Sequence, residues 1–270
     1  SYSVTGVQTC ALPIYYRHLL PRFVDGPVNF CAKHKITPNQ ISLLGFAISS
    51  IAAVLLAFPH LFLYNYTIIA GKFWWWWFGI PPLIFFIGGY VDVLDGALAR
   101  KTGQTSKFGG FLDSTLDRIS DAVVVLGLLF SGIVFPWNIA VNNVLCFICL
   151  VSMLMISYTR SRAELEGVVM KGIGFLERPE RVFMLLFAYL IEWAIFAVEE
   201  FFFGGRITYW FFPAFFIIFT VLCIQTFIAR VLWAEKWLNG KIPDKVEAML
   251  AKEAEAKAKQ NASKENAEQK

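Results

Sequence analysis

Charged residues are scarce in this chain of 270 residues, at 16% against the roughly 25% typical of a soluble domain. With 57% hydrophobic residues, the chain is neither disordered nor a coiled coil nor a DNA-binding domain, and we expect no nucleic-acid partner. Histidine (3) and cysteine (5) are also few and scattered, which excludes a histidine metal site and a disulfide framework. Cys146 and Cys149 form a C-x-x-C within an apolar run, where we expect packing residues.

Long apolar runs take the place of charge. Each of six runs is near or above the roughly 20 residues that a helix needs to span the hydrocarbon core. They cover residues 39–59, 77–100, 109–134, 138–162, 180–199 and 207–235. Because these runs are continuous and do not alternate, helices are favoured over a β-barrel. We therefore predict an all-α polytopic membrane protein with six transmembrane helices.

The segments around these runs define the predicted domain organisation. Residues 1–14 contain VTGVQTCALPI, which resembles a translated sequencing adapter, so we expect a non-native leader there. Residues 15–36 mix aromatic and basic residues and predict an interfacial juxtamembrane helix, broken near Pro21 and Pro27. Residues 37–238 form the six-helix domain, and residues 239–270 a charged cytoplasmic tail.

Basic residues concentrate at one end of the predicted helices. They precede the first run, separate the second from the third and the fourth from the fifth, and follow the sixth; the opposite loops hold only Lys72 and Arg206. By the positive-inside rule, we expect an integral cell-membrane protein with both termini and the active site in the cytoplasm.

Four aspartates stand at the facing ends of the second and third runs. Asp92 and Asp95 are spaced i, i+3, and Asp113 and Asp117 are spaced i, i+4, so each pair shares one helix face. A short connection makes the two helices antiparallel neighbours, so the pairs can face each other. Four carboxylates at membrane depth repel one another and need a counter-charge. Oxygen ligands without histidine or cysteine favour Mg²⁺, Mn²⁺ or Ca²⁺ over zinc.

Glycines and an arginine are interleaved with these acids. Gly96 follows Asp95, Gly109 opens the next helix, and Arg100 lies one turn beyond Gly96. Glycine permits close approach of a ligand, and hard metal ions bridge phosphate oxygens, so the pattern indicates a diphosphate site. The competing interpretation is a set of intramembrane acids in a transporter or proton path, which the paired spacing disfavours.

The full pattern is D-x-x-D-G-x-x-A-R, eight residues, G-x-x-x-D-x-x-x-D, from Asp92 to Asp117. It resembles the complete signature of the CDP-alcohol phosphotransferases. The resemblance implies that an alcohol attacks a CDP-linked lipid, that CMP leaves and that a phosphodiester forms. It also implies two divalent ions, Mg²⁺ or Mn²⁺, and a homodimer.

The resemblance further implies roles for individual residues. Asp92, Asp95 and Asp113 would hold the metal ions, and Asp117 would be a metal ligand, the general base on the acceptor hydroxyl, or both. The CDP moiety would be contacted by Asn39, Gly96, Arg100 and Gly109.

A cluster of arginines lies around the connection between the fourth and fifth runs. Arg160 and Arg162 end the fourth run, Arg178 and Arg181 start the fifth, and Arg230 lies near the end of the sixth. Membrane topology alone would explain these cations, but arginine forks also match phosphate oxygens and predict a pocket for a phosphorylated acceptor. R-x-R-A-E followed by E-R-x-E-R resembles archaetidylinositol phosphate and phosphatidylinositol phosphate synthases, which implies inositol phosphate as the acceptor.

Three functions therefore stay open at this stage. The first is metal-dependent transfer of a phosphatidyl or archaetidyl group from a CDP-lipid to inositol phosphate within the membrane. The second is the same chemistry with glycerol 3-phosphate or serine. The third is a non-enzymatic, ion-coupled membrane protein.

Overall fold

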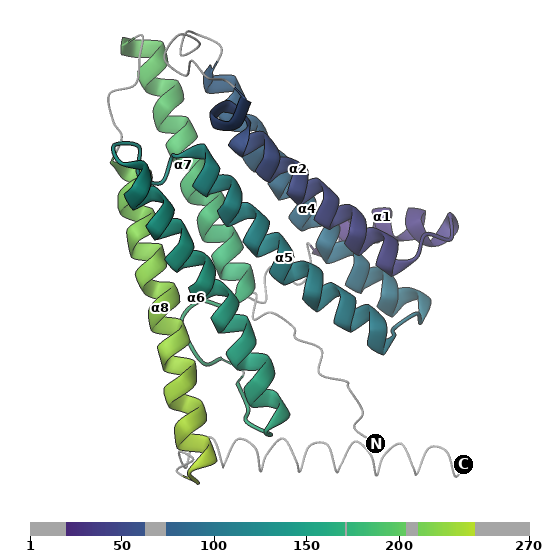
Figure 1. Cartoon of the computed structure of the whole chain (residues 1–270). Coiled ribbons are helices and arrows are strands. Elements are labelled where there is room, and N and C mark those ends of the chain that lie inside the picture. The colour runs from purple at the N-terminus through teal and green to yellow at the C-terminus, as the bar shows by residue number, and fades with distance from the viewer. Residues whose placement is uncertain (1–19, 63–73, 171, 204–209, 241–270) are drawn as a thin grey trace, which may run out of the picture.

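The computed structural model describes residues 20–62, 74–170, 172–203 and 210–240. Within these ranges every regular element is an α-helix, which confirms the predicted all-α class. The helices are α1 (Leu20–Lys33), α2 (Pro38–Phe62), α4 (Trp74–Thr102), α5 (Lys107–Ser131), α6 (Ile139–Leu165), α7 (Arg178–Phe203) and α8 (Phe211–Leu238) (Figure 1). The predicted leader at 1–14, and the predicted tail beyond residue 240, lie outside the described residues.

Among the described residues, five helices are long and apolar enough to cross a membrane, namely α2, α4, α6, α7 and α8. The chain is therefore a polytopic membrane protein. The helix α5 has a comparable length of 25 residues, but charged side chains crowd its first half. These charges separate it from the other five by composition, and several of them belong to the site described below.

The predicted break near Pro21 and Pro27 is wrong, because α1 continues through both prolines. Pro21 falls in the first helical turn, where a missing N–H costs no hydrogen bond, and Pro27 removes one bond from the helix interior. Packing offsets that loss: Val28 is buried against Leu94 and Leu98 of α4. This contact fixes α1 beside the end of α4 that carries the aspartates.

Two glycines, Gly45 and Gly127, allow α2 to lie unusually close to α4 and α5. A Cβ atom added to Gly45 of α2 would lie 3.3 Å from the backbone nitrogen of Asp92 and 3.3 Å from the carbonyl oxygen of Gly88. A Cβ atom on Gly127 of α5 would lie only 2.8 Å from the carbonyl oxygen of Ala53. Small residues at such crossings let helix backbones approach in membranes. The helices α2, α4 and α5 therefore form one tightly packed group.

The helices α6, α7 and α8 form a second group. In it α6 packs against α8, and α7 packs against α8 and also against α4. Its core contains Phe212, Phe216 and Phe219 of α8 together with Cys146 and Cys149 of α6, all completely buried. The cysteines are thus packing residues. Because α5 contacts both α2 and α6, it lies between the two groups (Figure 1).

The close approach at Gly127 predicts a stability difference between two glycines. Gly127→Ala places a methyl group within 2.8 Å of a backbone oxygen, whereas a Cβ on Gly89 of α4 meets no atom within 4 Å. Overpacking of this kind costs about 1–3 kcal/mol, so Gly127→Ala should lower the thermal unfolding midpoint in detergent. The matched Gly89→Ala variant should keep or raise the midpoint, because alanine favours a helix interior. Equal midpoints for the two variants would contradict the close packing.

Candidate active site

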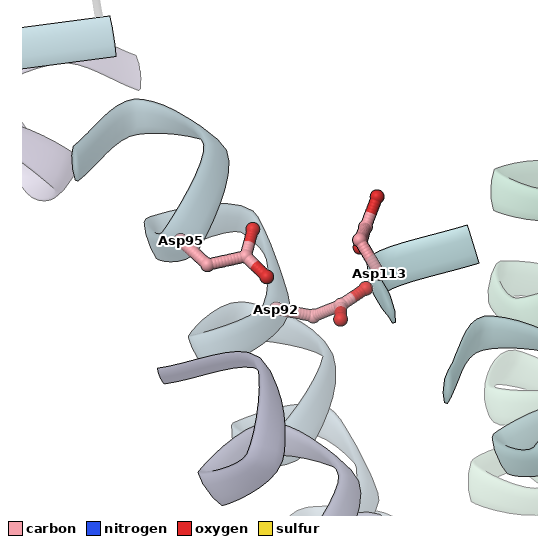
Figure 2. Close-up of side chains that lie close together, drawn as sticks. All are labelled: Asp92, Asp95 and Asp113. Carbon is pink, nitrogen blue, oxygen red and sulfur yellow. The ribbon is translucent and has the colours of Figure 1, made fainter. Parts of the chain in front are cut away.

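The predicted carboxylate cluster forms at the end of α4 and the start of α5. One oxygen from each of Asp92, Asp95 and Asp113 lies within 4.8 Å of the other two (Figure 2). The i, i+3 spacing puts Asp92 and Asp95 on one face of α4, and the turn between Thr102 and Lys107 returns the chain so that α5 presents Asp113 to that face. Three carboxylates at this spacing are a donor set suited to a hard divalent cation.

The start of α5 is fixed by its own capping residue. Ser106 is the N-cap, and its hydroxyl oxygen accepts a hydrogen bond of 2.9 Å from the backbone N–H of Gly109. Capping of this kind sets where a helix begins. Asp113 therefore follows at a defined position, a turn and a half into α5.

A serine on α2 orients Asp95. The hydroxyl of Ser42 donates a hydrogen bond to Asp95 Oδ2, and the Asp95 side chain is buried. Ser42 could not be predicted as a site residue from the sequence, because its partner lies 53 positions away and no local pattern links the two. The metal-binding face is thus supported from α2 as well as from α4 and α5.

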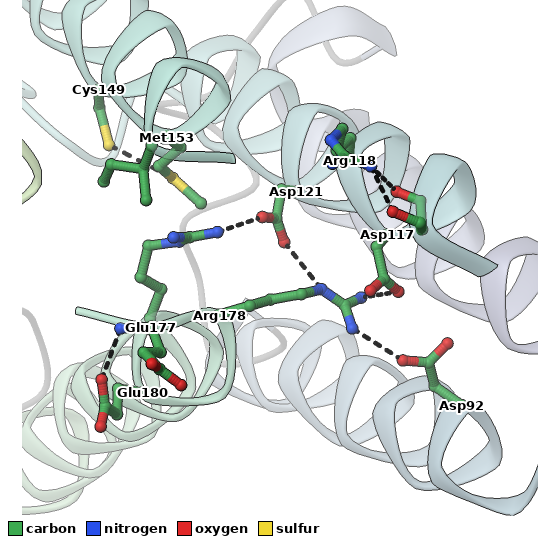
Figure 3. Close-up of polar contacts among 12 residues, drawn as sticks. Asp92, Asp117, Arg118, Asp121, Cys149, Met153, Glu177, Arg178 and Glu180 are labelled. Atoms are coloured by element: carbon green, nitrogen blue, oxygen red, sulfur yellow. Dashed lines mark hydrogen bonds and ion pairs between the residues drawn. The ribbon is translucent and has the colours of Figure 1, made fainter. Parts of the chain in front are cut away.

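Asp117, the fourth aspartate, points toward Arg178 and lies outside the three-carboxylate cluster. Arg178 Nη2 lies 2.7 Å from Asp117 Oδ1, and Arg178 Nη1 donates a hydrogen bond of 3.0 Å to Asp92 Oδ2 (Figure 3). One guanidinium group from α7 therefore joins a cluster carboxylate on α4 to Asp117 on α5.

Asp121 lies one turn beyond Asp117 and is buried. Its Oδ2 accepts a hydrogen bond of 3.0 Å from Arg181 Nη2, and Arg181 is almost completely inaccessible to solvent (Figure 3). Arg178 Nε lies 3.7 Å from the other oxygen of Asp121. A buried ion pair is strongly destabilised when one partner is removed, so Asp121 and Arg181 are a structural unit.

The residues predicted to contact the CDP moiety gather at the same end of the helices. A Cβ atom on Gly109 would lie 3.3 Å from Asn39 Oδ1, so the start of α2 and the start of α5 adjoin there. A Cβ atom on Gly96 would lie 3.4 Å from Arg100 Nη1, which places the arginine over the glycine on α4. Arg100 is exposed. Both glycines therefore leave space beside a polar side chain.

Four of the five predicted phosphate-binding arginines line one polar cavity. It has a volume of about 280 Å³ and lies among α5, α6, α7 and α8. Its lining includes Arg160, Arg178, Arg181 and Arg230, together with Arg118, Ser114, Ser157, Ser161, Asp117, Asp121 and Glu164. Five arginines face three carboxylates, so the lining carries an excess of two positive charges.

Of the five arginines predicted to bind phosphate, Arg162 does not line the cavity. Its side chain is 57% exposed and forms an ion pair of 2.8 Å with Glu166, whereas the side chain of Arg160 is 25% exposed. Two residues along a helix rotate by about 200°, so these neighbours point to nearly opposite sides of α6.

Arg230 lines the cavity but is held by backbone groups. It is buried and donates to the carbonyl oxygens of Ile156 at 2.8 Å and Ile173 at 3.0 Å. These bonds tie α8 to α6 and to the connection between α6 and α7. Arg230 therefore shapes the cavity wall.

Arg118 is a cavity residue that the sequence analysis missed. Its guanidinium donates to Ser114 Oγ at 2.6 Å and to Ser161 Oγ at 2.7 Å. Its position next to Asp117, on the face that also presents Ser114 and Asp121, is the periodic signal that could have revealed it.

The chain matches a family model and resembles characterised relatives. The model for CDP-alcohol phosphatidyltransferase matches residues 35–222. The archaetidylinositol phosphate synthase of Pyrococcus horikoshii is 43% identical over 157 residues, which cover 58% of this chain and 71% of that protein.

Solved structures of one relative share the fold. The Mycobacterium tuberculosis phosphatidylinositol phosphate synthase with CDP-DAG bound has a TM-score of 0.62 and 27% identity, covering 79% of this chain and 94% of that chain. The same synthase in complex with manganese and citrate has a TM-score of 0.60 and 27% identity, covering 77% of this chain and 87% of that chain.

The family match spans most of the chain and includes the whole aspartate signature, from Asp92 to Asp117. It favours an enzyme over the non-enzymatic, ion-coupled protein considered above. The chain belongs to the CDP-alcohol phosphatidyltransferase family and is a membrane-embedded transferase of phosphate-containing groups.

Proposed function

We propose that this protein transfers a lipid phosphatidyl-type group from a CDP-linked lipid to inositol phosphate and releases CMP. The observation that carries the proposal is the adjacency of two subsites. The carboxylate cluster suits divalent cations, the arginine-lined cavity suits a small anion, and Arg178 belongs to both. The names of the similar synthases support inositol phosphate as the acceptor.

The carboxylate cluster is the proposed seat of two divalent cations, Mg²⁺ or Mn²⁺. Asp92, Asp95 and Asp113 would hold them, with Asp117 at the edge of the centre. Bound there, the cations would neutralise the diphosphate and stabilise the leaving CMP. A manganese-bound structure of a similar synthase supports this choice of metal. Asn39, Gly96, Arg100 and Gly109 would contact the cytidine diphosphate.

Asp117 is the proposed general base. It lines the acceptor cavity and shares Arg178 with the cluster residue Asp92, so an acceptor hydroxyl bound between the two subsites would lie near it. The hydroxyl oxygen would attack the lipid-bearing phosphorus, its proton would pass to Asp117, and the bond between the two phosphates would break. The products would be a lipid phosphodiester and CMP.

The cavity is the proposed site of the acceptor's phosphate. An excess of two positive charges matches a phosphate monoester, which carries close to two negative charges near neutral pH. Serine lacks this group and is a poorer match, whereas glycerol 3-phosphate shares it. Competition between inositol phosphate and glycerol 3-phosphate in a CMP-release assay therefore tests the acceptor directly.

We also propose that α5 is the sixth transmembrane helix, with both termini and the active site cytoplasmic. It contacts α2 and α6, which are both long and apolar enough to span a membrane, and its C-terminal part, from Ala122 to Ser131, carries no charge. Its charged half would then lie at the cytoplasmic surface, where the charged substrates are.

The metal proposal predicts loss of activity when one cluster carboxylate is neutralised. Asp95→Asn removes one negative charge at nearly constant volume, so CMP release should fall by at least about 100-fold, as expected for an essential electrostatic group. Excess EDTA should do the same to the unaltered protein. Asp25→Asn on the exposed face of α1 is the matched control and should retain activity. Full activity of Asp95→Asn in EDTA would exclude the metal centre.

If Asp117 is the general base, its substitution should affect turnover much more than binding of the CDP-lipid. Asp117→Asn should bind the CDP-lipid with nearly unchanged affinity and release CMP about 10²–10⁴-fold more slowly, the contribution typical of a positioned base. Binding is measured by displacement of a labelled CDP-lipid, and turnover by CMP release. Loss of CDP-lipid binding would instead identify Asp117 as mainly a metal ligand.

The cavity predicts different effects at two neighbouring arginines. Arg160→Ala removes a cavity cation and should raise KM for inositol phosphate about 30-fold or more, since losing one partner of a hydrogen-bonded charge pair costs about 2–5 kcal/mol. Arg162→Ala, on the outer side of α6, should change KM less than about threefold, within the range of surface ion pairs. Steady-state kinetics at saturating CDP-lipid decide the point, and equal effects would argue against this cavity as the acceptor site.

A further inference from the structure

Arg178 is the cavity arginine that also reaches the carboxylate cluster. Its Nη1 atom lies 3.0 Å from Asp92 Oδ2 and its Nη2 atom 2.7 Å from Asp117 Oδ1. The other cavity arginine of α7, Arg181, forms its ion pair within the described residues with Asp121, which is not part of the cluster. Arg178 thus connects the two subsites of the proposed function, on which the following inference rests.

The side chain of Arg178 has room to move while its backbone is held. It is 32% exposed, against 2% for the side chain of Arg181. The first turn of α7 is fixed by a hydrogen bond of 2.6 Å from the Glu177 N–H to Glu180 Oε2, and Pro179 restricts the backbone directly after Arg178. A rearrangement at this position is therefore confined to the long side chain, which can swing between neighbouring partners.

Asp92 cannot serve Arg178 and a divalent cation equally well. Its carboxylate belongs to the three-carboxylate cluster and accepts the Arg178 hydrogen bond at the same time (Figures 2 and 3). A divalent cation at the cluster would repel the guanidinium and would compete with it for the Asp92 carboxylate. The guanidinium would then turn toward the remaining partners in the cavity, Asp117 and Asp121, and toward any anion there.

We propose that Arg178 competes with divalent cations for Asp92 and, once displaced, donates to the acceptor's phosphate, so that metal binding and acceptor binding favour each other. The acceptor subsite would then bind the acceptor's phosphate most tightly only when divalent cations occupy the carboxylate cluster. By thermodynamic linkage the effect is reciprocal: inositol phosphate must tighten metal binding by the same factor.

A purely structural role for Arg178 makes the opposite prediction for metal affinity. If Arg178 only orients Asp92 and Asp117, its removal loosens the cluster, and the metal binds more weakly. If Arg178 competes with the metal, its removal frees Asp92, and the metal binds more tightly. The direction of the change in affinity therefore distinguishes the two roles without any measurement of catalysis.

The experiment measures Mn²⁺ binding to the full chain in detergent without CDP-lipid, by the electron paramagnetic resonance signal of free Mn²⁺. Arg178→Gln and Arg178→Met are compared with the unaltered protein, each with and without inositol phosphate. Arg162→Gln is the matched control, because Arg162 lies outside the cavity and pairs with Glu166. Thermal unfolding identifies which variants are folded. If Arg178→Gln does not fold, Arg178→Met is used for the comparison.

We expect the folded Arg178 variant to bind Mn²⁺ at least about fivefold more tightly than the unaltered protein, and Arg162→Gln to match the unaltered protein. We also expect inositol phosphate to tighten Mn²⁺ binding of the unaltered protein by about 5- to 150-fold, the usual range of coupling between sites. This coupling should largely disappear in the variant.

Equal or weaker Mn²⁺ binding by the folded variant would overturn the proposal, as would independent binding of Mn²⁺ and inositol phosphate to the unaltered protein. Coupling of undiminished size in the variant would also overturn it, since the two ligands would then communicate without Arg178. CMP release by the unaltered protein, measured in parallel with inositol phosphate, tests the proposed function separately. The Mn²⁺ comparison without acceptor tests the competition even if that acceptor proves wrong.

Discussion

Repulsion among carboxylates crowded at one end of a helical bundle is the constraint on which the rest of this structure depends. Three carboxylate oxygens lie within 4.8 Å of one another. Each pair of full charges at that distance repels by roughly 3 kcal/mol at an effective dielectric constant of about 20. A hydrogen bond from Ser42 to Asp95 and the guanidinium group of Arg178 beside Asp92 stabilise these carboxylates. The helices that carry these groups must therefore be held together firmly, which the glycine contacts of α2 achieve.

The local features of the site could be predicted from the sequence because they follow from helix periodicity. The spacing of Asp92 and Asp95, and the short connection to Asp113, were sufficient to predict the cluster that the structure contains. Periodicity also bears on Arg160 and Arg162, since two positions along a helix reverse direction. Charge composition alone nonetheless predicts one pocket for both, because it does not take the helix face into account.

Features that depend on tertiary packing could not be predicted. Ser42 reaches Asp95 from another helix, and Asp121 is buried by Arg181 across 60 positions of sequence. Asp121 continues the i, i+4 spacing of Asp113 and Asp117, but that spacing does not reveal that its side chain is buried. The continuity of α1 through Pro27 depends likewise on its contact with α4, which overrides the local preference of proline.

The two hydrogen bonds that Arg230 donates to backbone carbonyl groups affect the electrostatic potential in the cavity. Carbonyl oxygens left open beside a pocket present partial negative charge and would repel an incoming anion. Arg230 donates hydrogen bonds to the carbonyl oxygens of Ile156 and Ile173. Ile156 is part of helix α6. These two carbonyl oxygens therefore present less partial negative charge to the cavity. Arg230 can in this way favour anions over cations at a site that it need not touch.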